Sequence, residues 1–268
     1  MTSPTTFKIP PVLCYHRIGG PLELGVTRVS RSVFARQMTS LARAGWRTLT
    51  LAEFGRRVTY PASRLPDPEV LLTFDDGYAS LGDEVYPLLG ELGFTATTFL
   101  VADYVGRLNT WDVRYTRDRL RHLDWTALEQ WLARGFDFGS HSASHARLTW
   151  LSDAAAAAEL ARSRATLVAR LGPDAGRAVA YPFGACDERV RRLAAEAGYE
   201  LGFGGLRGQA GALGLARVPV YSWDVGTLPW GLREDGLGAL ARVAAHAANR
   251  CAVGTSVIKR DWGLGARG

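Results

Sequence analysis

Two adjacent carboxylates, Asp75 and Asp76, follow a short apolar run and stand before a glycine. The run covers residues 70–74 and reads VLLTF, as expected of a buried strand. Neighbouring carboxylates repel each other unless a cation or a proton lies between them. Taken alone, the string favours an Asp-Asp-Gly turn with both carboxylates in water. A cation site therefore needs further ligands elsewhere in the chain.

Two of the five histidines are candidates for those ligands. His141 and His145 are four residues apart, so they can share one face of a helical turn and converge on one cation. Two imidazoles and one carboxylate form a three-ligand set that suits a catalytic divalent metal such as zinc. The second carboxylate can then take a proton from an attacking water beside the metal.

Short apolar strands alternate with amphipathic helices along most of the chain. Strands are expected at 11–15, 70–74, 95–101, 136–139, 178–180, 200–203, 217–220 and 255–259, and helices from about 30, over 79–92, 124–133, 152–171, 187–197 and 237–249. This alternation predicts parallel pairing with right-handed crossovers. Seven or eight units favour a closed or nearly closed α/β barrel, a distorted and incomplete (β/α) barrel of about seven parallel strands. No linker is evident, so residues 1–268 are expected to form one domain with its core at about 11–260. An open doubly wound sheet is the alternative, but no Gly-x-Gly-x-x-Gly follows the first strand.

The carboxyl ends of barrel strands carry the functional groups in such folds. Polar or aromatic residues follow five of the expected strands: His16, the pair Asp75 and Asp76, the segment 139–145, the segment 181–184, and Trp223 with Asp224. We therefore expect these residues to form one constellation at the mouth of the barrel.

Composition narrows the class of partner. The formal charge is +6, but the basic residues are nearly all arginines scattered among acids, and no basic stripe interleaved with aromatics occurs. Nucleic-acid binding is therefore not expected. The three cysteines are far apart and form no Cys-x-x-Cys, so neither a disulfide framework nor a thiolate zinc site is indicated.

The chain lacks the marks of membrane insertion or export. It begins without a signal peptide, and no apolar run reaches the roughly 18 residues of a spanning helix. We expect a soluble, cytoplasmic protein unless an export signal has been trimmed, and no feature indicates an oligomeric state.

The motifs together resemble the polysaccharide deacetylases, carbohydrate esterase family four. Three motifs carry the resemblance: Thr-Phe-Asp-Asp-Gly at 73–77, His-Ser-Ala-Ser-His at 141–145 and Tyr-Pro-Phe-Gly at 181–184. In addition, the segments 12–16 and 32–50 resemble the branch of the family that N-deacetylates exopolysaccharides. The similarity runs from about residue 11 to 220, and the order and spacing of the motifs make it specific.

The resemblance implies a distorted, incomplete (β/α) barrel and a set of roles. Asp76, His141 and His145 would hold one divalent metal ion, most typically Zn²⁺ with Ni²⁺ or Co²⁺ as alternatives. Asp75 would be the general base, and the backbone N–H of Phe183 would help to stabilise the oxyanion. The reaction would be metal-dependent hydrolysis of an N-acyl group, most often N-acetyl on an amino sugar, releasing acetate and a free amine.

Two departures from the family pattern stand out. Ala180 replaces the arginine with which most members begin the third motif and which orients the base; part of the exopolysaccharide branch also lacks it. The late Leu-x-His that supplies a general acid is missing, since residues 256–261 contain no histidine. His16 and Asp224, both at strand ends, are the candidate substitutes. His122, in an arginine-rich loop, is expected to be solvated.

The remaining candidates concern the substrate. Tyr181 and Pro182 belong to the third motif, and Trp223 resembles the family's fourth-motif tryptophan, so all three are expected to line the pocket. Trp111 could stack on a sugar or pack on the barrel rim. The expected substrate is an N-acylated amino sugar, a glycan or a sugar-bearing metabolite. Two alternatives remain: a deformylase or cyclic-amide hydrolase on the same scaffold, and a catalytically impaired glycan-binding homologue.

Overall fold

The computed structural model describes residues 9–20, 26–61, 68–111, 120–229 and 232. The expected helix at 237–249 and strand at 255–259 lie outside the described residues. The extent of the single domain, 1–268, therefore stays a prediction. In the described part of the chain, no helix combines the length and apolar character needed to cross a bilayer. The cytoplasmic location stays a prediction as well.

A curled sheet of seven parallel strands forms the centre of the protein, in the order β10-β1-β5-β6-β7-β8-β9. The strands are β1 (Val12–Tyr15), β5 (Glu69–Phe74), β6 (Thr97–Leu100), β7 (Asp137–Ser140), β8 (Ala178–Ala180), β9 (Leu201–Phe203) and β10 (Val218–Pro219). The short β4 (Arg47–Thr48) pairs with the start of β5. This confirms the predicted incomplete barrel. It also confirms, within a residue or two at most ends, every predicted strand that lies in the described residues.

The two edges of the sheet are joined by irregular backbone between β9 and β10. Leu215 bridges to Phe203 of β9, and the N–H of Arg217 donates to the carbonyl of Gly205 at 3.1 Å. Because β10 then pairs with β1, this segment brings Arg217 next to the mouth strands β1 and β5.

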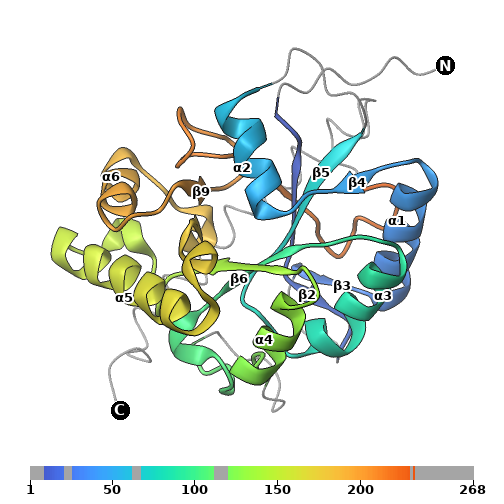
Figure 1. The fold of residues 1–268 in the computed structure, drawn as a ribbon, viewed down its shortest axis with the longest axis horizontal. Helices are drawn as coiled ribbons and strands as arrows, with labels where there is room; N and C mark the ends of the chain where they lie inside the picture. Colours follow the sequence, from blue (N-terminus) through green and yellow to red (C-terminus); the bar gives the residue numbers. More distant parts are fainter. Residues whose placement is uncertain (1–8, 21–25, 62–67, 112–119, 230–231, 233–268) are drawn as a thin grey trace.

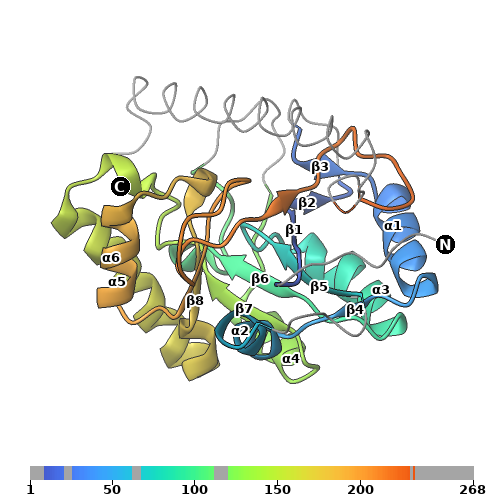
Figure 2. The same cartoon turned by 90° about the horizontal axis from the view of Figure 1, so that it is seen from above.

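Within the described residues, six α-helices pack around the sheet. They are α1 (Arg31–Arg43), α2 (Leu51–Thr59), α3 (Tyr86–Glu91), α4 (Trp125–Leu132), α5 (Asp153–Leu171) and α6 (Glu188–Glu196). Helices α1 and α3 lie on one side of the curled sheet and α5 and α6 on the opposite side (Figure 1), and Figure 2 shows the same division from above. Side chains of Ser30, Asp124, Ser152 and Asp187 accept N-terminal N–H groups of four of them.

Shorter elements complete the chain. A π-helical turn, η1 (Leu81–Val85), precedes α3 within the single helix expected over 79–92. The 3₁₀ turns are η2 (Ala102–Tyr104), η3 (Leu148–Trp150), η4 (Pro173–Gly176) and η5 (Pro182–Gly184). A separate two-stranded sheet pairs β2 (Arg17–Ile18) with β3 (Arg28–Val29).

Alternation along the strands divides their side chains between two cores. In β5, Val70, Leu72 and Phe74 pack outward against the helices, whereas Leu71 packs into the barrel interior. The interior core contains Phe54 of α2 against Phe203 of β9, with ring centroids 5.8 Å apart. Helix α2 thus fills the interior with apolar side chains at the end of the strands away from the mouth. At the mouth, the inward-facing rows of β1, β5 and β7 end in polar residues predicted from the sequence, His16, Asp75 and His141.

Candidate metal centre and active site

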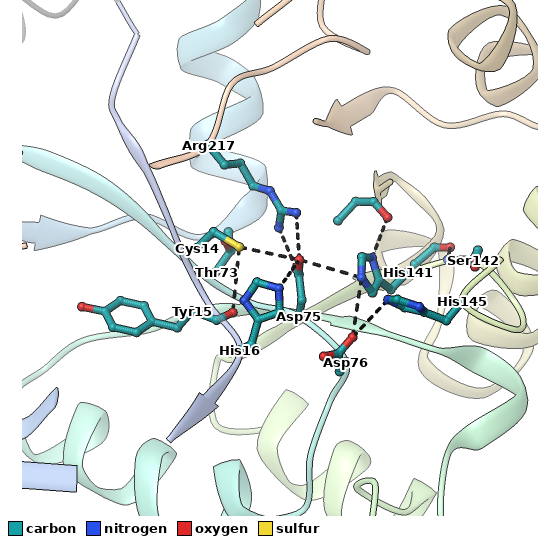
Figure 3. A network of polar contacts seen from close by, with 12 residues as sticks. Cys14, Tyr15, His16, Thr73, Asp75, Asp76, His141, Ser142, His145 and Arg217 are labelled. Atoms are coloured by element: carbon teal, nitrogen blue, oxygen red, sulfur yellow. Dashed lines mark hydrogen bonds and ion pairs between the residues drawn. The ribbon is translucent and has the colours of Figure 1, made fainter. Parts of the chain in front are cut away.

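Three predicted ligands converge at the carboxyl ends of β5 and β7. Nε2 of His141 and Nε2 of His145 lie 3.6 and 3.5 Å from the same oxygen, Oδ1 of Asp76. One ligand atom from each of the three residues lies within 4.8 Å of the others, and all three side chains are buried. Figure 3 shows both imidazoles directed at the Asp76 carboxylate. The two imidazoles therefore converge, but not on one face of a helical turn as expected, because residues 141–145 form an irregular loop with a positive φ at Ser142 and His145.

The protonation state of His141 suits a metal ligand. Its Nδ1 lies 2.7 Å from the carbonyl oxygen of Ala180, and a carbonyl only accepts, so Nδ1 carries the proton. The lone pair on Nε2 then faces Asp76. Burial lowers the pKa of His141 and so favours the neutral ring, although the nearby Asp75 carboxylate acts in the opposite direction. Neutral imidazoles with a carboxylate are the donor set that zinc and similar divalent ions take, so these residues fit the expected cofactor.

The backbone of this site is strained. Among the described residues, four that are not glycine have a positive φ: Asp76 (70°), Ser142 (62°), His145 (61°) and Phe183 (61°). All four belong to the three motifs. A left-handed conformation costs a non-glycine residue about 1–2 kcal/mol, and such residues persist where the surrounding structure holds them. Two metal ligands and the predicted oxyanion donor are thus placed by a backbone that sequence propensity opposes.

Two side chains hold the strained segments. The carboxylate of Glu159, on α5, accepts the N–H groups of Ala143 and Ser144 at 3.1 and 2.9 Å and fixes the loop between the two histidines. Nδ1 of His122 lies 2.7 Å from the carbonyl of Asp76 and donates to it. His122 is only 2% exposed, so the expectation that it is solvated is wrong. Burial lowers its pKa to about 4, which keeps the ring neutral.

The second carboxylate, Asp75, is held by a residue that sequence reasoning missed. Nη1 and Nη2 of Arg217 lie 2.6 and 2.8 Å from Oδ1 and Oδ2 of Asp75, a bidentate pair. Arg217 is 5% exposed and Asp75 2%. Burial alone would raise the pKa of Asp75, but Arg217 holds it well below its usual range, with His141 and His16 acting in the same direction. Arg217 thus contacts the base directly, in a chain whose third motif begins with Ala180.

His16 and Cys14 also lie against Asp75. Nε2 of His16 is 3.7 Å from Oδ2, and the Cys14 thiol is 3.6 Å from the same oxygen and donates to it (Figure 3). Burial lowers the pKa of His16 to about 4, although Asp75 opposes the shift, so this imidazole is neutral at pH 7. Burial raises the pKa of the Cys14 thiol, which stays protonated. Of the two substitutes considered for the late histidine, His16 therefore lies within reach of the base.

The second substitute, Asp224, lies elsewhere. Its backbone carbonyl and its carboxylate both accept from Nε2 of Gln37, on α1, at 2.9 and 3.3 Å. The hydrogen bonds and ion pairs of Asp75 with other described side chains are with Arg217, Cys14, His16 and His141 and do not include Asp224. Its neighbour Trp223 is half-buried, with its ring 4.8 Å from that of Tyr221.

The third motif divides its residues between pocket and core. The N–H groups of Gly184 and Ala185 donate to Tyr181 and Pro182, whereas no acceptor among the described residues takes the N–H of Phe183. The ring of Phe183 lies 4.8 Å from that of His145. Tyr181, in contrast, is fully buried in the outer core, and its hydroxyl donates to the carbonyl of Leu213. Pro182 is buried as well. The structure thus places Tyr181 behind the strand, where its side chain supports the motif.

Trp111 stacks on His145, one of the predicted metal ligands. Its ring lies 3.8 Å from that of His145 at an interplanar angle of 26°, and it is 7% exposed. His122, behind it, stacks on Tyr78 with centroids 5.3 Å apart. Of the two interpretations considered for Trp111, packing at the rim is the one that its burial favours. This aromatic wall covers the side of the metal site formed by the loop after β6.

A parallel half-barrel with an Asp-Asp pair and a His-x-x-x-His pair at its mouth is the arrangement of a barrel hydrolase of the deacetylase class. The chain belongs to the polysaccharide deacetylase family, whose model matches residues 62–202. A relative in Bacillus subtilis (strain 168), the putative polysaccharide deacetylase YxkH, is 28% identical over 193 residues. The match covers 72% of this chain and 63% of YxkH, so the chain spans less than two thirds of that relative.

Solved structures show the same fold. IcaB from Ammonifex degensii is 25% identical, with a TM-score of 0.68, and the match covers 91% of this chain and all of that one. The Streptococcus pyogenes deacetylase PplD, solved in complex with acetate, is 22% identical with a TM-score of 0.69, covering 83% of this chain and 95% of that one. At that identity, the likeness to PplD is one of fold.

Proposed function

We propose that this protein is a metal-dependent N-deacetylase that hydrolyses the N-acetyl group of an amino sugar in a glycan or sugar-bearing metabolite. The observation that carries the proposal is the division of labour between two adjacent carboxylates. Asp76 faces two imidazoles, and Asp75 faces an arginine. This arrangement provides a cation site and a separate, ionised base at one pocket mouth.

Asp76, His141 and His145 would hold the metal, with Zn²⁺ the ion that best matches the ligands and Ni²⁺ or Co²⁺ as alternatives. A divalent ion held there supplies Lewis acidity, which makes a water more acidic and polarises an amide carbonyl. The resulting three-ligand site leaves coordination positions open, as a catalytic site requires.

Asp75 acts as the general base and accepts a proton from the attacking water. Arg217 keeps this carboxylate ionised at neutral pH and fixes both oxygens, so one lone pair is directed consistently at the pocket. Arg217 also lowers the basicity of Asp75, so proton transfer to it depends on a water that is already acidified. The shared burial of Asp75 and His141, 3.8 Å apart, supports this placement of base beside ligand.

The N–H of Phe183 stabilises the oxyanion that forms when water adds to the amide carbon. The left-handed backbone at Phe183 turns this N–H away from the local turn, where it has no acceptor among the described residues. Removal of one such donor typically costs about 10²–10³ in kcat. The departing nitrogen needs a proton, and Asp75, once protonated by the water, returns it either directly or through its neutral neighbour His16, which accepts a proton at one ring nitrogen as it donates from the other.

An acyl-group panel tests the proposal. Amine release is measured for protein loaded with Zn²⁺, on N-acetylhexosamine oligomers, their N-formyl counterparts and cyclic imides side by side. The proposal expects N-acetyl hydrolysis that is lost in Asp76→Ala and His141→Ala. Preference for the N-formyl or cyclic substrates would identify the protein as a deformylase or a cyclic-amide hydrolase that uses the same residues. Glycan binding with no turnover under any divalent metal would identify the chain as a binding homologue.

A further inference from the structure

Arg147 follows the metal ligand His145 by two residues and lies between two aromatic rings. Its guanidinium carbon is 4.9 Å from the ring centroid of Trp150 and 5.7 Å from that of Phe183. The Phe183 ring in turn lies 4.8 Å from the ring of His145. Arg147 is therefore one aromatic ring away from the metal ligands, at the rim between the loops that follow β7 and β8.

The guanidinium of Arg147 has no polar partner in the described part of the chain. Its Nε and Nη1 are sealed from solvent without a hydrogen-bond acceptor. None of the ion pairs among the described residues includes it, although Arg162, Arg189 and Arg192 on the neighbouring helices all reach carboxylates. An arginine stays protonated in proteins, so the charge is present whether or not a partner faces it. The structure thus retains a half-buried cation beside the candidate site, with two of its nitrogens sealed from solvent and without an acceptor.

The two rings account for only part of the arginine's stabilisation. The guanidinium carbon lies over the face of each ring, where the attraction is that of a cation to a ring quadrupole. The N–H groups lie at its edge, in the plane, and a desolvated donor without an acceptor is costly. A guanidinium edge matches the paired oxygens of a carboxylate or a phosphate. A polar group left in this state calls for an explanation, such as a ligand that satisfies it when bound.

We propose that Arg147 forms an anion-binding subsite that takes a carboxylate or phosphate on the glycan next to the sugar being deacylated. The inference deepens the proposed function and rests on it for the position of the amide. Because Phe183 supplies the oxyanion N–H and its ring contacts the Arg147 stack, a substrate bound at Phe183 places its neighbouring group close to this cation. Arg147 thus selects acidic over neutral glycans.

The kinetic test compares matched substrates. N-acetylglucosamine oligomers that are neutral, that carry one uronate, or that carry one phosphate are assayed with wild type, Arg147→Met and Arg147→Lys. We expect Arg147→Met to lower the ratio of kcat/KM for anionic over neutral substrate roughly 10- to 100-fold, the worth of one charge-assisted hydrogen bond. Arg147→Lys restores part of the ratio, because lysine keeps the charge without the planar fork.

A matched control is available on the surface. Arg170 stacks on Trp125 at the same distance, 4.9 Å, away from the three motifs, so Arg170→Met is expected to leave the ratio unchanged. The uronate and phosphate arms identify which anion is the ligand. An equal loss on neutral and anionic substrates in Arg147→Met, or an unchanged ratio, overturns the proposal.

A binding measurement separates this inference from the proposed function. Calorimetric titration of metal-free protein with N-acetylglucosamine 1-phosphate, a glucuronate-containing disaccharide and N-acetylglucosamine needs no turnover. We expect at least one anion to bind more tightly than the neutral sugar, with an affinity that falls as salt rises and is lost in Arg147→Met. Equal binding by wild type and Arg147→Met overturns the subsite even if deacetylation is observed. Binding without any deacetylation keeps the subsite and rejects the enzyme activity.

Discussion

Replacement of Arg217 by methionine tests how the base is held. The variant keeps most of the apolar stem and removes the cation that faces Asp75. The two groups are 5% and 2% exposed, and breaking such a buried pair costs about 3–5 kcal/mol because one charge is left without a partner. At the size of this protein, that cost lowers the Tm by roughly 6–20 °C.

The pH dependence of this loss has a defined sign. Arg217 lowers the pKa of Asp75, so the pair stabilises the fold above the ordinary aspartate pKa of about 4 and loses this effect as pH falls. In Arg217→Met, burial is opposed only by His141 and His16, so the pKa of Asp75 rises. The stability difference between wild type and variant is therefore expected to be largest near pH 7 and to shrink in acid. The acid limb of kcat/KM is expected to move to higher pH.

The assay is urea unfolding of metal-free protein across pH, paired with pH–rate profiles of metal-loaded protein. Arg192→Met is the control, because Arg192 makes two exposed ion pairs that solvent screens. Arg217→Lys is expected to recover part of the stability but not the bidentate geometry. An Arg217→Met protein as stable as the control, with an unmoved acid limb, would refute the role assigned to this arginine.

Three further predictions concern neighbouring residues. Asp75→Asn is expected to lower kcat by about 10²–10⁴ while one metal equivalent is still bound, measured by amine release and metal analysis; loss of the metal as well would contradict its assignment as base. Gly77→Ala is expected to destabilise more than Gly45→Ala, measured by urea unfolding, since both have a positive φ but only at Gly77 would a Cβ meet Leu100, at 2.5 Å. His122→Ala is expected to weaken Zn²⁺ binding by about 10- to 100-fold, measured by competition with a chelator, because it releases the Asp76 carbonyl; unchanged affinity would show that the hydrogen bond only packs the loop.

The strand ends and the cluster of Asp76, His141 and His145 could be predicted because their signals are local. In β1, β5 and β7, the inward row of side chains ends in His16, Asp75 and His141, one position past each strand, and the parallel pairing of Tyr15 with Phe74 brings His16 beside Asp75. The same alternation also predicts that the Tyr181 side chain points away from the barrel interior. Ala178 and Ala180 face the interior, so the next residue must face outward. Helix α2 is absent from the helices expected from the sequence, although it has a local signal, the capping box of Thr50 and Glu53.

Arg217, His122 and Glu159 could not be found in this way. Arg217 lies 142 positions from Asp75 and just before its strand, whereas the rule for barrels directs attention to residues after strands. Ala180 indicates that the arginine which orients the base in most family members is missing from the third motif, but it does not indicate which other residue contacts Asp75. His122 reaches the site from a loop through one hydrogen bond to a backbone carbonyl, and Glu159 reaches it from a helix by accepting two backbone N–H groups. Such contacts leave no periodic pattern in a sequence.

The most direct test of the central claim is a titration of metal-stripped protein with Zn²⁺ while amine release from an N-acetylhexosamine oligomer is followed. The account predicts no activity before metal is added, a linear rise that ends at one equivalent, and no rise in Asp76→Ala. Full activity in stripped protein, or metal-dependent activity that survives Asp76→Ala, would contradict it.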